Sequence, residues 1–166
     1  MSQQATKTFK DDLGREWTVD ITTATMLRVK AMVGFSFDSL IGKIGKDKPT
    51  KEEVQAAASP LEDFIDDGER FAVVLWAILK PDAEKLGVNE EQFHGGFRGE
   101  GTQRAISAFL QALSDFSQHP AKKMVIRGVS LAWRGMKRAE AKAMELAAKM
   151  EAEVTDEKID AELEKQ

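Results

Sequence analysis

Hydrophobic residues recur at helical spacing along most of the chain, and the densest apolar run covers residues 71–79. Ser59 suits a helix N-cap, Pro60 suits the first helical position, and Pro81 suits a stop. We therefore expect one helix over residues 59–81. Its second half is apolar on nearly every side, so other elements should surround it.

Residues 9–21 have a different period. A cluster of turn residues separates two β-prone arms, and Trp17, Val19 and Ile21 alternate with polar residues in the second arm. This pattern predicts a β-hairpin with one apolar face. Because an isolated two-stranded hairpin is only marginally stable in water, that face should pack on the helices.

Several shorter helices carry start or stop signals. These signals are Thr22 or Thr23 with Gly34, Thr50 with Glu53, Asn89 with Gln92, and Thr102 with the pair His119 and Pro120. Residues 42–51 combine two glycines, a proline and four lysines, which predicts an exposed loop.

The last predicted helix, over residues 121–150, carries a heptad-like apolar seam. Its positions alternate four and three residues apart and fall within a sector of about 100°. The seam consists of Val125, Val129, Ala132, Met136, Ala139, Ala143, Leu146 and Met150. It either packs in the chain's own core or binds a partner helix, because a helix of about 45 Å outruns a domain of this size. With Trp133 beside them, these residues are the candidate partner-binding set.

Together the patterns predict a mainly α fold, in which an N-terminal β-hairpin packs on a helical bundle, followed by a long C-terminal helix and an acidic tail. We expect residues 1–120 to form the hairpin and helical core, and residues 121–150 to form the long amphipathic helix. Residues 151–166 carry seven acidic residues against two lysines, which predicts a frayed or conditionally helical tail.

Composition narrows the function classes. The 166-residue chain has no cysteine, which excludes disulfides, thiolate catalysis and cysteine-bound metals. The start of the chain has no apolar signal segment, and the run at 71–79 is too short for the roughly 20 residues that cross a bilayer. We expect a soluble protein that does not act at a membrane.

Few residues suggest chemistry. Acids at Glu62, Asp63, Asp66 and Asp67 could bind a cation, but acids at a helix start are the simpler interpretation. His94 and His119 lack partners at metal or triad spacing, and the glycine-rich loop 95–101 lacks the Lys-Ser/Thr ending of a phosphate loop. We therefore expect no catalytic, cofactor or metal site.

A basic stripe lies opposite the seam and consists of Lys123, Arg127, Arg134 and Arg138. Such a stripe could contact a nucleic-acid backbone, but the acidic tail beside it would repel phosphate, and the whole chain carries a net charge of −4. We expect no nucleic-acid binding and a stripe that is solvated or paired with the tail.

Five stretches of the chain resemble one family. They are TFKDDLGREWTV at 8–19 with TMLRVK at 25–30, LKPDAEKLGV at 79–88 with EQF at 91–93, and the segment 105–116 that ends in LSDF. In order and spacing they are similar to small proteins encoded among the tail genes of long-tailed phages and taken to be tail assembly chaperones. The resemblance covers roughly residues 8–150.

The resemblance implies a non-enzymatic protein of the bacterial host cytoplasm. It would bind the tape-measure and tail-tube proteins during tail assembly and would associate with itself. The alternative is a structural adaptor or minor tail component that stays in the virion.

Overall fold

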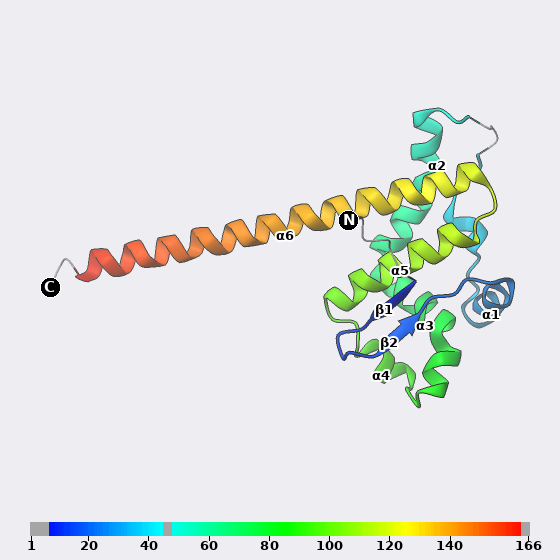
Figure 1. Ribbon diagram of the computed structural model, residues 1–166, viewed down its shortest axis with the longest axis horizontal. Helices are drawn as coiled ribbons and strands as arrows, with labels where there is room; N and C mark the ends of the chain where they lie inside the picture. The colour runs from blue at the N-terminus through cyan, green and yellow to red at the C-terminus, as the bar shows by residue number, and fades with distance from the viewer. Residues whose placement is uncertain (1–6, 45–47, 164–166) are drawn as a thin grey trace. The chain divides into compact units, whose positions relative to one another are not determined.

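Helices make up most of the chain, and a two-stranded antiparallel hairpin precedes them, as predicted (Figure 1). The computed structural model describes residues 7–44 and 48–163, with side chains as far as residue 152. The elements are β1 (Thr8–Lys10), β2 (Glu16–Thr18), α1 (Thr23–Val33), the 3-10 helix η1 (Phe37–Leu40), α2 (Lys51–Asp66), α3 (Gly68–Lys85), α4 (Glu90–His94), α5 (Glu100–Phe116) and α6 (Pro120–Leu163).

The hairpin presents its apolar face to the helices. Phe9 of β1 pairs with Trp17 of β2, and both side chains are buried, as are Val19 and Ile21. The strand β1 contacts α5, and β2 contacts α3. The predicted face is therefore confirmed, and each large side chain that it buries stabilises the fold by about 1.5–3 kcal/mol.

The helix α3 is the centre of the fold, because it contacts α1, α2, α4 and β2. Its residues from Val74 to Leu79 are all buried, in agreement with the expectation that other elements surround this run. Phe64 of α2 packs against Phe35, Phe71 and Phe109, with ring centres 4.9–5.7 Å apart. This cluster ties together α2, α3, α5 and the segment before η1.

The prediction of a single helix over residues 59–81 is wrong. The chain forms α2 and α3, which are separated at Asp67, and Asp67 caps α3 by accepting a hydrogen bond from the Arg70 N–H at 3.1 Å. The predicted capping box of Thr50 and Glu53 is present, but the helix that it starts runs through Pro60 to Asp66. A proline lacks only one donor, and α2 tolerates that loss at Pro60.

Pro81 is not a helix stop either, since α3 continues to Lys85. A proline in a helix leaves the carbonyl four residues earlier without its donor, and here that carbonyl belongs to Ala77. The Arg28 side chain of α1 supplies the donor, as Nε donates to Ala77 O at 3.1 Å and a terminal guanidinium nitrogen to Ile78 O at 2.9 Å.

Other local signals are confirmed. Thr22 caps α1, and Gly34 ends it with a φ of 67°. Asn89 and Gln92 form the predicted capping box of α4. The helix α5 begins at Glu100, two residues before the expected Thr102, and ends at Phe116, before the expected stop at 119–120. The loop expected over 42–51 falls partly on residues 45–47, outside the described residues.

The contacts of the chain divide it into two units, Met1–Ser130 and Leu131–Gln166. The boundary lies within α6 and not at residue 120, where we placed the end of the core. The backbone of the second unit is helical to Leu163, so the segment 151–163, expected to be a frayed or conditionally helical tail, continues the helix. Residues 164–166 lie outside the described part of the chain.

Candidate functional site

The predicted seam divides into a buried part and an exposed part. Val125, Val129 and Trp133 are buried, whereas every seam residue from Ala132 onward is exposed. The two interpretations left open by the sequence thus describe different parts of α6. Val125 and Val129 serve as core within the first unit, and the later positions are free of such packing.

We call the later positions the exposed seam: Ala132, Met136, Ala139, Ala143, Leu146 and Met150. The three large side chains, Met136, Leu146 and Met150, are 52%, 61% and 59% exposed. Ion pairs between Lys137 and Glu140 and between Glu145 and Lys149, both at 2.8 Å, decorate the polar side of the same segment. The segment 131–152 is therefore an amphipathic helix whose apolar face meets solvent.

The basic stripe opposite the seam keeps two exposed side chains, Arg127 and Arg138, while Lys123 and Arg134 are half-buried. The expectation that the acidic tail pairs with this stripe falls on side chains beyond residue 152, outside the described part. That the stripe is solvated or paired with the tail therefore stays a prediction.

The acidic cluster is not at a helix start, so that interpretation is wrong for three of its four members. Glu62, Asp63 and Asp66 lie in the last turns of α2, and only Asp67 caps a helix. The Arg70 guanidinium carbon lies 5.4 Å from the ring centre of Phe35. Within the described residues, no group of three or more histidines, cysteines, aspartates or glutamates is placed to hold a metal ion.

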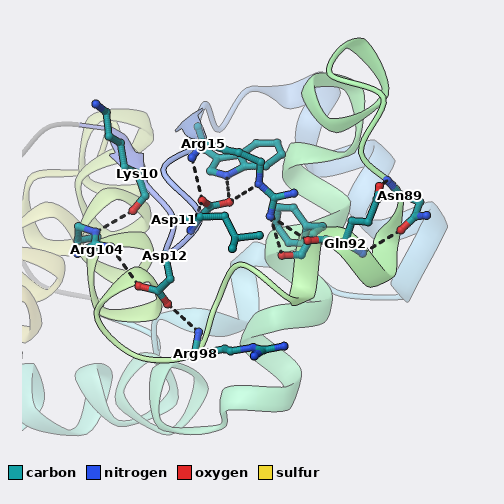
Figure 2. A network of polar contacts seen from close by, with 11 residues as sticks. Lys10, Asp11, Asp12, Arg15, Asn89, Gln92, Arg98 and Arg104 are labelled. Atoms are coloured by element: carbon teal, nitrogen blue, oxygen red, sulfur yellow. Dashed lines mark hydrogen bonds and ion pairs between the residues drawn. The ribbon is translucent and has the colours of Figure 1, made fainter.

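Two adjacent aspartates in the hairpin turn hold the first unit together at a site that the sequence analysis missed. The side chain of Asp11 is buried and accepts hydrogen bonds from Trp17 Nε1 at 2.9 Å and Arg15 Nε at 2.6 Å (Figure 2). It also accepts from the N–H groups of Leu13 and Arg15. Arg15 in turn donates to the Gln92 carbonyl at 2.9 Å, which ties the turn to α4.

Asp12 closes the other half of this arrangement. Its carboxylate accepts from the N–H groups of Arg98 at 2.7 Å and Gly101 at 2.8 Å, at the start of α5. Arg104 joins it at 3.2 Å and also donates to the Lys10 carbonyl at 2.7 Å (Figure 2). We call this set of contacts made by Asp11 and Asp12 the carboxylate latch.

The latch explains the glycine-rich loop. A Cβ on Gly96 would lie 2.6 Å from the Asp11 carboxylate, and a Cβ on Gly101 would lie 2.8 Å from that of Asp12. Both distances are too short for real atoms, so the glycines allow the turn to approach. The loop does bind an anion through its N–H groups, as phosphate loops do, but the anion is the chain's own Asp12.

Both latch carboxyls have a lowered pKa. Burial of Asp11 raises its pKa, but hydrogen bonds from Trp17 and Arg15 outweigh that effect. The pKa of Asp12 is lowered first by the Arg98 N–H, against some desolvation, and further by Gly101 and Arg104. In both cases the shift follows from the hydrogen bonds and the ion pairs that join the hairpin turn to its neighbours.

A hollow of about 640 Å³, which we call the notch, opens beside the latch. Leu13 of the hairpin turn, together with Leu86 and Val88 after α3, supplies its apolar lining. The polar lining residues are Asp12, Arg15, Gln92 and Arg98.

A second hollow, of about 460 Å³, lies between α1, η1, the end of α5 and the start of α6. Its floor includes the buried Phe37, Leu113 and Ile126, and His119 lies at its edge. His94 lies on α4 with Nε2 3.7 Å from a Glu90 carboxylate oxygen.

None of the helices in the described ranges has the length and apolar character needed to cross a membrane. Comparisons of the chain with protein-family models, with curated proteins and with solved structures give no match.

Proposed function

We propose that this protein is a non-enzymatic tail assembly chaperone that acts in the cytoplasm of a bacterial host. It binds the tape-measure protein, and with it the tail-tube protein, while the tail of a long-tailed phage is built. It also associates with copies of itself. The family resemblance over roughly residues 8–150 suggests this role, and the exposed seam of α6 is the observation that carries it.

The exposed seam suits a long helical client. Solvent-exposed apolar positions on one face of a helix are the usual means of pairing with another amphipathic helix. The alanines at 132, 139 and 143 permit close approach of a partner backbone. The methionines at 136 and 150 adapt to irregular surfaces, because their side chains are unbranched and polarisable.

Co-expression with the tape-measure protein encoded by the neighbouring gene tests the proposal. We expect the two proteins to purify as a complex, and the tape-measure protein to be more soluble than when expressed alone. If no complex forms and the solubility of the tape-measure protein does not rise, the proposed role is refuted.

Matched variants locate the surface. Leu146→Glu should abolish the complex, whereas Leu27→Glu, at a leucine of similar exposure on α1, should leave it intact. Equal effects of the two changes would show that the exposed seam is not the binding surface.

The second candidate is a structural adaptor or minor tail component. An apolar helix face would serve permanent packing in a particle as well as transient binding, so the same seam supports it. Mass spectrometry of purified virions separates the two roles. A chaperone should be absent from them, and an adaptor should be present at a fixed copy number.

A further inference from the structure

Two exposed leucines line the notch. Leu13 is 64% exposed and Leu86 is 56% exposed, and the half-buried Val88 lines the same hollow. Single exposed leucines are common on protein surfaces. Here three apolar side chains line one hollow of about 640 Å³, and ligands usually bind at concave surfaces lined by apolar groups.

The unpaired charge among the described residues of the notch is positive. The Arg98 side chain is exposed and makes no hydrogen bond or ion pair with the described residues, since only its backbone N–H contacts Asp12. Arg15 also lines the notch, but its charge is already offset by Asp11, with Nε and the carboxylate oxygen 2.6 Å apart. Asp12 is the carboxylate among the described lining residues, and its charge is already offset by Arg104 and two N–H groups.

The walls of the notch are fixed before any partner arrives. The latch holds the hairpin turn against the glycine loop, and the Asp12 N–H donates to the Gly96 carbonyl at 2.8 Å. Arg15 is held by Asp11 and by the Gln92 carbonyl. A surface that needs no ordering on binding loses less entropy than a flexible one.

We propose that the notch binds a segment of a protein partner in which an apolar side chain stands within about two residues of a carboxylate. The apolar side chain lies between Leu13 and Leu86, and the carboxylate pairs with the Arg98 guanidinium. A nucleic acid would meet the same arginine but would place phosphate and sugar against the leucines. This surface is separate from the exposed seam and does not depend on the proposed chaperone role.

Peptide display against the full chain tests the inference. Random peptides should be enriched for an aliphatic or aromatic residue next to aspartate or glutamate. The same selection against Arg98→Glu should lose the acidic residue and favour lysine or arginine in its place. A synthetic peptide from the first selection should bind Arg98→Gln on the order of tenfold more weakly than the parent chain.

Matched variants serve as controls. Lys30→Glu reverses another exposed charge and should leave the selected motif unchanged. Leu13→Ser or Leu86→Ser should weaken the peptide, and Leu27→Ser should not. Circular dichroism of each variant confirms that it is folded, and Arg98→Gln avoids adding a charge beside Asp12.

Three results would overturn the inference. They are no enriched motif, an acidic motif that survives Arg98→Glu, or a motif that depends equally on Leu27 and Leu13. Tight binding of a single-stranded oligonucleotide that is lost in Arg98→Gln, with no peptide selected, would assign the notch to nucleic acid instead.

Discussion

Arg28 donates to the carbonyl of Ala77, the group that Pro81 leaves without a helical donor, with Nε and the oxygen 3.1 Å apart. The proline and the arginine therefore form a functional pair, although Arg28 lies on α1 and Pro81 on α3. The helix α3 continues past Pro81 to Lys85. The same contact fixes α1 against the central helix.

Arg28→Met should lower the free energy of unfolding by about 1–3 kcal/mol, because it leaves a buried carbonyl without a donor. Pro81→Ala restores the backbone donor, so the cost of Arg28→Met should be smaller in that background. Urea denaturation of the four chains in this double-mutant cycle measures the coupling. Equal costs of Arg28→Met in both backgrounds would show that the two residues are not coupled.

Gly96→Ala and Gly101→Ala should each destabilise the chain by about 1–3 kcal/mol, because the added methyl group overlaps a latch carboxylate. Gly128→Ala is the control. It lies within α6 with nothing near its Cβ position, so it should stabilise the helix by about 0.5–1 kcal/mol. Thermal unfolding of the three variants gives their order of stability. A stabilised Gly101→Ala chain would contradict the contact with Asp12.

Asp11→Ala should cost about 3–5 kcal/mol, because it leaves the Arg15 charge without its buried partner and Trp17 Nε1 without an acceptor. Chemical denaturation should show a lower midpoint with an unchanged slope. Asp20→Ala, at an exposed aspartate outside the latch, is the matched control and should stay within about 0.5 kcal/mol of the parent chain. Similar losses for both would argue against a special role of Asp11.

The latch should weaken in acid. Both carboxyls have a folded pKa below the ordinary value of 3.8, so the unfolded chain takes up protons first as the pH falls. Their stabilisation is complete above about pH 4 and is lost as the pH drops through the lower folded pKa values. The difference in urea midpoint between the parent chain and Asp11→Asn/Asp12→Asn should therefore shrink from about pH 7 to about pH 3. A difference in urea midpoint that grows in acid would contradict the lowered pKa of the two carboxyls.

The two parts of the seam should respond differently to charge. Val129→Glu buries a carboxylate in the core and should lower the melting temperature by several degrees or more. Met136→Glu changes an exposed position and should alter the free energy of unfolding by no more than about 0.5 kcal/mol, while self-association is lost. Calorimetry with analytical ultracentrifugation measures both, and unfolding by Met136→Glu would assign that position to a core.

Sequence patterns predicted the features that depend on neighbours a few residues apart. The caps at Thr22, Thr50 and Asn89 and the inward face at Trp17 belong to this class. Pro60 and Pro81 led to wrong helix bounds because a proline removes one backbone donor, and a helix continues past it when that loss is tolerated or when another group donates in its place. For Pro81 the replacement lies about 50 residues away in sequence, as the separation of Arg28 and Ile78 shows.

The latch was missed for the same reason. Asp12 and Gly101 are 89 residues apart, and no local period connects them. The turn aspartates and the glycine loop each carried a signal, since adjacent acids suit a turn and clustered glycines permit close approach. The spacing of apolar residues predicted the whole seam. Only the burial of each residue in the structure shows that the exposed part begins after Val129.

The length of the loop that the latch closes also sets an order of events during synthesis. Lys10 and Arg104 are 94 residues apart, and ribosomes add about 5–20 residues per second. The hairpin strands are therefore synthesised roughly 5–20 seconds before the arginine that anchors them. A two-stranded hairpin holds together poorly alone, so Phe9 and Trp17 spend that interval without their final cover. The apolar face of the hairpin is therefore a surface that this protein must protect from aggregation during its own synthesis.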